Sequence, residues 1–220
     1  MQNHLLQVCS PRNVVALFWD PFLTCGLTHL LQLFMFSAME IGDGSDAAIA
    51  KNKVEFLAAI DVLKMDDTVL AQFTGYLEDE TVPEGSKCPT YAAVSLNVNN
   101  DRWKGVPMMI TAGKGLSERT CTVEATLKPG LPYKSVLLRI QPDPGLWLIG
   151  PDGSTEIPFM EALPDSTGVF DYERILFDGA RGSKTLMIGA EELREAWRIF
   201  TPLLDQVSPH AIGRLCWVCF

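Results

Sequence analysis

The chain contains three short segments in which apolar and polar residues alternate, joined by turn residues that leave no room for connecting helices. They lie at residues 94–99, 120–127 and 136–141. Alternation of this kind is typical of strands with one buried and one wetter face, and short connections favour antiparallel pairing. We therefore expect an antiparallel sheet in the middle of the chain, with further strands near residues 146–149 and 185–188.

Helical periodicity flanks this region on both sides. Residues 33–40 are an apolar helical segment, and the next helix has an apolar stripe that we assign to the core. This stripe consists of Ile49, Phe56, Ile60 and Leu63. Residues 171–177 predict a third helix. The predicted fold class is α+β, a mostly antiparallel sheet with helices packed on one face.

Residues 191–200 predict the strongest helix, which is acidic in its first turn as the helix dipole prefers. Its expected buried face is Leu193, Trp197, Phe200 and Leu204, and Pro202 should kink or end it. After Val207 the pattern is lost, and residues 212–220 are expected to be an unstructured apolar tail.

Charge and cysteine content limit the classes of function. The chain has 27 acidic and 18 basic residues, a net charge of −9, which argues against a nucleic-acid surface and leaves anionic ligands dependent on local clusters of cations. The six cysteines show no framework spacing and no cleavable signal peptide is visible, so a cytoplasmic location is favoured, with the plastid stroma as the alternative.

Three patterns are set aside. The stretch 13–40 is interrupted by Asp20 and Pro21, so no membrane span is expected. Residues 42–47 fit GxGxxA but follow no strand, so we interpret them as a loop from which Ser45 or Asp46 caps the next helix. Cys216 and Cys219 form a single CxxC pair without a partner pair, and no metal site is predicted.

One stretch stands out chemically, the strand–turn–strand segment at residues 106–119. Its glycine-punctuated turn carries Lys114 and Arg119, and Gly113 and Gly115 allow backbone angles and close approaches that other residues resist. A mobile ammonium and a planar guanidinium together suit a phosphate or sugar phosphate. On these residues alone, two solvated cations at a hairpin tip are the simpler interpretation.

Seven sequence segments, taken in their order along the chain, give a stronger indication of function. The chain resembles the C-terminal half of glucose-6-phosphate dehydrogenase, and we predict one C-terminal domain over residues 1–207. The matching segments are MQNHLLQ (1–7), LFMFSAME (33–40), GYLEDETVPEGS (75–86), NNDRWKGVPMMITAGKGLSER (99–119), LLRIQP (137–142), DYERILFD (171–178) and ELREAWRIFTPLL (192–204).

The resemblance implies roles for individual residues. The family oxidises glucose 6-phosphate at C1 to the 6-phosphoglucono-lactone and passes hydride to NADP, and the proton acceptor of its QNHLLQ motif falls on His4. Its substrate-binding lysine and arginine fall on Lys114 and Arg119, and the glutamine of its RxQP strand on Gln141. Arg139 matches a residue that contacts a second, structural NADP in animal enzymes.

The chain also departs from the family. It shows no coenzyme-domain glycine loop, and Thr111, Thr120 and Glu124 stand where animal enzymes carry cations for the structural NADP. Residues 8–32 and 208–220 do not match, and deleting 8–32 restores the motif spacing, as expected of a retained intron or a genuine insertion. The insert ends in a second HLLQ, so His29 competes with His4 for the base position.

Two functional hypotheses remain. In the first, the chain is the substrate-binding and dimerisation part of an NADP-dependent enzyme, homo-oligomeric when complete, with glucose 6-phosphate as ligand and with neither nucleic acid nor membrane as partner. In the second, it is a non-catalytic module that pairs with other subunits through its sheet. The intact substrate turn favours the first, and the missing coenzyme loop favours the second for this polypeptide.

Overall fold

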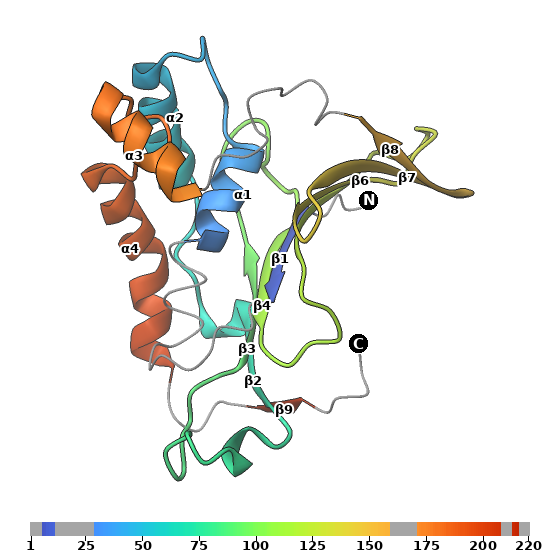
Figure 1. Ribbon diagram of the computed structural model, residues 1–220, viewed down its shortest axis with the longest axis vertical. Coiled ribbons are helices and arrows are strands. Elements are labelled where there is room, and N and C mark those ends of the chain that lie inside the picture. Colours follow the sequence, from blue (N-terminus) through green and yellow to red (C-terminus); the bar gives the residue numbers. More distant parts are fainter. Residues whose placement is uncertain (1–5, 12–28, 159–170, 208–212, 216–220) are drawn as a thin grey trace.

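A computed structural model describes residues 6–11, 29–158, 171–207 and 213–215. These residues form a nine-stranded sheet, and helices α1 to α4 lie on one side of it (Figure 1). Six of the eight strand pairings are antiparallel and two are parallel. The predicted α+β class with a mostly antiparallel sheet is therefore confirmed.

The strands run in the spatial order β8-β7-β6-β5-β1-β4-β3-β2-β9. Their bounds are β1 Leu6–Pro11, β2 Thr68–Phe73, β3 Tyr91–Leu96, β4 Met108–Gly113, β5 Cys121–Thr126, β6 Ser135–Gln141, β7 Gly145–Gly150, β8 Gly153–Ile157 and β9 Gly213–Leu215. The three alternating segments of the sequence become β3, β5 and β6. Strand β2, a short apolar run, is one that the alternation did not reveal.

Strand β1 occupies an unexpected place between β4 and β5. It pairs in parallel with β4, from Leu6↔Met108 to Pro11↔Gly113, and antiparallel with β5. Residues 8–32 do not match the family motifs, yet residues 8–11 pair with two strands and Leu30 and Leu31 belong to the core. Residues 12–28 lie outside the described residues.

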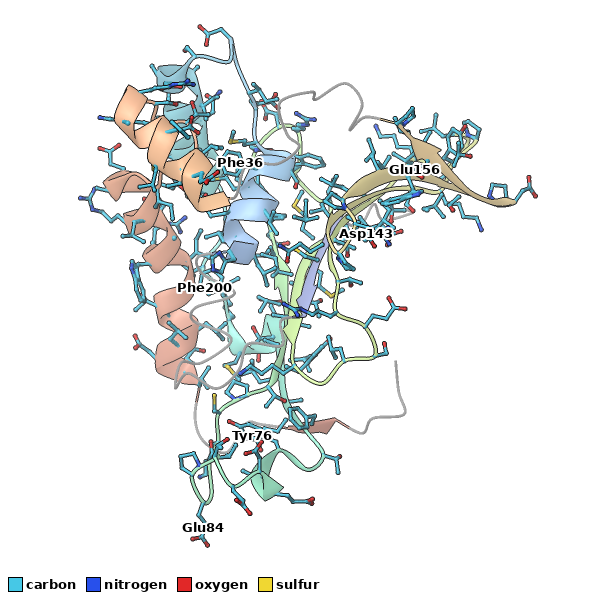
Figure 2. The ribbon with its side chains drawn as sticks, viewed as in Figure 1. Phe36, Tyr76, Glu84, Asp143, Glu156 and Phe200 are labelled. Carbon is cyan, nitrogen blue, oxygen red and sulfur yellow. The ribbon has the colours of Figure 1, made fainter. Side chains whose placement is uncertain are left out.

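The helices are α1 Leu31–Ala38, α2 Asp46–Ala58, α3 Asp171–Arg181 and α4 Ala190–Gln206, with short 3-10 turns at Met65–Asp67 and Tyr76–Glu78. The core lies where α1, α2 and α4 meet β2, β3 and β4. Figure 2 shows Phe200 of α4 between that helix and the sheet. The burial of the predicted stripe is confirmed, because Ile49, Phe56, Ile60 and Leu63 all belong to the core, but Ile60 and Leu63 follow the end of α2 and are not helical.

The loop before α2 is confirmed as a capping loop. Residues 42–44 form a turn and a bend, and the Ser45 hydroxyl accepts a hydrogen bond from the Ala48 amide at 3.2 Å. Asp43 accepts from the Ser45 hydroxyl and amide, which lowers the pKa of its carboxyl below 3.8. The glycine pattern therefore serves a helix start and not a dinucleotide.

Helix α4 is rotated relative to its predicted phase. Its buried residues are Glu192, Ala196, Ile199, Phe200 and Leu203, whereas Leu193 and Trp197 are 41% and 45% exposed. The prediction for Leu193 and Trp197 is therefore wrong. Two apolar stripes run side by side on this helix. The buried stripe includes the acidic Glu192, so the sequence pattern favoured the other stripe.

Glu192 is buried because it pairs with Lys53 of α2. The Lys53 ammonium lies 3.3 Å from the Glu192 carboxylate, donates to the Met187 carbonyl at 3.1 Å and sits 4.9 Å from the centre of the Phe36 ring. The Gln32 amide also donates to Glu192. This closed polar network joins α1, α2 and α4 and sets the rotation of α4.

Three further predictions about local structure are wrong. Residues 185–188 form no strand, because the Thr185 hydroxyl bonds Asp46 and the Met187 carbonyl serves Lys53. Helix α4 continues through Pro202 to Gln206. Residues 213–215 form β9, which pairs with β2; residues 208–212 and 216–220, with the CxxC pair, lie outside the described residues.

Candidate functional site

The turn that carries Lys114 and Arg119, which we call the cation turn, leaves the end of β4 and leads into β5. It is not a hairpin tip, because β1 lies between the two strands that it joins. Arg119 is exposed and Lys114 is half-buried. Within the described residues, neither side chain has a hydrogen-bond or ion-pair partner, so both cations are available to an anion.

The glycines of this turn are required by internal packing. Gly115 has φ +67°, and a Cβ there would lie 3.2 Å from the Phe73 ring. A Cβ on Gly113 would lie 2.9 Å from the Tyr91 ring and 3.0 Å from Leu116. Side chains of the protein therefore make the close approaches at these glycines, and the expected approach of a ligand stays a prediction.

Thr90 fastens the turn to the core. It is 1% exposed, and its carbonyl accepts from the Lys114 amide at 2.8 Å. Its amide donates to the Ala71 carbonyl, and its hydroxyl accepts from the Phe73 amide, both at 2.8 Å. No sequence pattern marks this residue, which lies between Pro89 and β3 in a stretch without periodicity.

Gln141 lies on the strand next to the turn. The register of β5 and β6 pairs Gln141 with Cys121, two residues after Arg119. The same register shifts between Cys121 and Thr122, so the simple alternation that would place Gln141 on the face of Arg139 is broken. The structure thus brings Gln141 to the Arg119 end of the turn.

Arg139 lies further along β6 and already has partners. Its guanidinium sits 4.5 Å from the centre of the Trp147 ring and donates to the Asp143 carbonyl at 2.9 Å. Trp147 lies close over Gly145, where a Cβ would be 2.0 Å from the ring. This stack is worth roughly 0.5–2 kcal/mol.

The surroundings of Arg139 do not fit a second NADP well. Arg139 pairs with Thr122 on β5, and Thr111 of β4 lies in line with them across β1. The Thr111 hydroxyl has no hydrogen-bond partner among the described residues. Two residues along β5, Glu124 presents a carboxylate that accepts from the Ser135 hydroxyl at 2.6 Å. A phosphate-rich ligand would meet one engaged cation and one anion, so the role of Arg139 stays a prediction.

The two candidate bases differ in what can be said of them. His4 lies outside the described residues. His29 is exposed and directly precedes Leu30, which is fully buried and lines a small internal void together with Ala92 and Ala112. Ala112 stands two residues before Lys114, so the start of α1 lies over the end of β4 from which the cation turn departs.

A cavity of the described residues lies elsewhere, between α2 and the segment leading into α4. It has a volume of about 820 Å³ and is lined by residues that include Lys53, Met187 and Glu192, which satisfy one another. None of the predicted site residues lines it. In the described ranges, no cluster of metal-ligating side chains occurs and no helix has the length and apolarity needed to cross a bilayer.

The comparisons with known proteins agree on one family. Residues 27–150 match the family model described as glucose-6-phosphate dehydrogenase, C-terminal domain. Similar curated proteins include the glucose-6-phosphate 1-dehydrogenase of Drosophila melanogaster, 34% identical over 217 residues, and that of Dictyostelium discoideum, 34% identical over 218 residues. Both matches cover 84% of the chain but only 41% and 43% of the relatives.

Solved structures give the same answer. One, described as glucose-6-phosphate dehydrogenase in complex with its substrate glucose-6-phosphate, aligns with a TM-score of 0.83 and 25% identity over 98% of this chain and 52% of its own. The enzyme from Mycobacterium avium aligns with a TM-score of 0.76 and 26% identity, over 96% of this chain and 51% of its own. The chain spans about half the length of the proteins it matches. It belongs to the glucose-6-phosphate dehydrogenase family, whose C-terminal domain it contains.

Proposed function

We propose that this chain is the substrate-binding part of an NADP-dependent glucose-6-phosphate dehydrogenase of the oxidative pentose phosphate pathway. The observation that carries the proposal is the cation turn: the side chains of Lys114 and Arg119 have no partner among the described residues, yet Thr90 holds the Lys114 amide and the Phe73 ring lies against Gly115. Gln141 lies on the adjoining strand. A solved relative whose description names glucose 6-phosphate as its substrate supports the choice of sugar phosphate.

In this proposal each residue has a stated task. Arg119 holds two oxygens of the anion with its planar fork, and Lys114 adds a mobile point charge. A histidine accepts the proton of the C1 hydroxyl, and the lost proton eases departure of the hydride from C1. His4 has the fuller motif, whereas the family match over residues 27–150 and the position of Leu30 support His29. The nicotinamide coenzyme, when bound, accepts the hydride.

The second candidate, a non-catalytic module that pairs through its sheet, is favoured by a different observation. Strands β6 to β8 curve away from the helices (Figure 1), and residues 146–149 of β7 are half-buried, with none of the described helices over them. The same surface would serve a homo-oligomer of a complete enzyme. Genomic DNA that encodes a coenzyme domain in frame upstream of Met1 would favour the enzyme. The relatives include cytoplasmic and chloroplastic enzymes, and we favour the cytoplasm.

Steady-state kinetics test the proposed site in a complete enzyme built by joining this chain to the coenzyme-binding half of a relative. Arg119→Ala should raise the Michaelis constant for glucose 6-phosphate about tenfold or more, because a charge-assisted hydrogen bond contributes roughly 1.5–3 kcal/mol. Arg119→Lys should restore little of it if the planar fork is used. Arg102, which pairs with Glu40 on the surface, provides the matched control. Unchanged kinetics in Arg119→Ala would return the turn to an ordinary surface loop.

A further inference from the structure

The cation turn poses a physical problem, because its ligand-facing groups are mobile. Lysine and arginine side chains lose considerable rotamer freedom when they are fixed on a ligand. A turn that also moved at the backbone would add to this loss. The protein therefore gains affinity from any contact that fixes the backbone of the turn before the ligand arrives.

Thr90 and Phe73 provide that contact in two steps. The Thr90 carbonyl holds the Lys114 amide directly, and the Thr90 hydroxyl holds the Phe73 amide, each at 2.8 Å. Phe73 in turn lies under Gly115, and its ring meets Tyr76 edge-on with centroids 5.5 Å apart. Three consecutive elements, β2, β3 and β4, are thereby joined at the point where the turn begins.

We infer that Thr90 is a positioning residue for the anionic group of the substrate, acting through the backbone of Lys114 and through the Phe73 ring beneath Gly115. The inference rests on the proposed function. Thr90 touches no ligand itself, because it is 1% exposed and its amide, carbonyl and hydroxyl are all engaged within the protein. Its side chain is nevertheless specific: a hydroxyl is required, since valine of equal shape offers the Phe73 amide no acceptor.

The test uses the full 220-residue chain and glucose 6-phosphate, with affinity measured by calorimetry and backbone motion by amide hydrogen exchange. Thr90→Val should weaken binding about fivefold, the factor that corresponds to one ordinary hydrogen bond, and should speed exchange at Lys114 and Gly115. Thr90→Ser keeps the acceptor and should restore both values. Phe73→Leu, which thins the support under Gly115 and leaves Thr90 intact, should also weaken binding and provides a second variant if Thr90→Val folds poorly.

The matched control is Thr68→Val. Thr68 lies at the opposite end of β2 from Phe73, and its hydroxyl donates to the Lys64 carbonyl at 2.8 Å. This variant should change neither affinity nor exchange at the turn. All variants are compared at a temperature where circular dichroism shows each of them to be fully folded. Differences in global stability then do not contribute to the measured differences in affinity.

The outcomes separate the two claims. Binding that Arg119→Ala abolishes but Thr90→Val and Phe73→Leu leave unchanged would overturn the positioning role and leave the proposed function standing. Equal loss of affinity in Thr90→Ser and Thr90→Val would also overturn it, because the hydroxyl would then not matter. No heat of binding with the unsubstituted chain would overturn the proposed function, and the positioning role would fall with it.

Discussion

Lys53 and Glu192 show how one buried polar pair can decide the orientation of a helix. Their side chains are 2% and 3% exposed, and each has further polar partners in Met187, Gly189 and Gln32. Such a pair adds little net stability compared with apolar residues, but removing one partner leaves a buried charge uncompensated. Substitutions in this pair therefore test which side of α4 faces the core.

Glu192→Ala should lower the free energy of unfolding by about 3–5 kcal/mol, because it strands the Lys53 ammonium. The double variant Lys53→Met with Glu192→Leu should recover most of that loss. Glu55→Ala, which breaks the exposed Lys51–Glu55 pair, is the matched control and should cost about 0.5 kcal/mol or less. Urea denaturation measures all three. A Glu192→Ala cost as small as that of Glu55→Ala would contradict the buried network.

At the scale of elements, α4 offers two leucines in the same helix with opposite environments. Leu203 is 0% exposed and Leu193 is 41% exposed. Leu203→Ala should lower the free energy of unfolding by about 2–5 kcal/mol, through lost burial and the cavity left behind. Leu193→Ala should cost about 0.5 kcal/mol or less. The phase read from the sequence predicts the reverse, so thermal or chemical unfolding of these two variants decides between the two orientations.

The junction between α2 and the segment before α4 should depend on pH. Hydrogen bonds from the Thr185 hydroxyl and the Lys184 amide to Asp46 hold the pKa of that carboxyl below 3.8. A depressed carboxyl pKa contributes stability that is fully present above 3.8 and is lost as the pH falls through the folded value. Titration of the Asp46 carboxyl carbon by NMR should give a midpoint below 3.8 that rises toward 3.8 in Thr185→Val. The same midpoint in both proteins would disprove the link.

These elements show which parts of the fold could be predicted from the sequence. Strands β5 and β6 were predictable because each alternates and they are neighbours in the chain. The place of β1 was not, because its partner β4 lies about a hundred residues away and short range patterns carry no information on such pairings. The motif located Lys114 and Arg119, but Thr90 was invisible because its role depends on three backbone groups brought together by the fold.

At the scale of the whole molecule, the sheet has two parts with different surroundings. Strands β2 to β4 lie beside the helices, whereas β6 to β8 extend away from them, and β1 pairs with both β4 and β5 between these parts (Figure 1). The cation turn connects β4 to β5 across β1, so it spans the boundary between the helix-covered part and the uncovered part. Gln141 approaches it from the uncovered side.

The most direct test of the central claim is a crystal structure of the chain with glucose 6-phosphate. We predict that the sugar phosphate lies at the turn, within hydrogen-bond distance of the Lys114 ammonium and the Arg119 guanidinium, with Gln141 beside it. Sugar phosphate bound instead in the cavity between α2 and α4, or a saturated crystal with no ligand at the turn, would contradict the assignment.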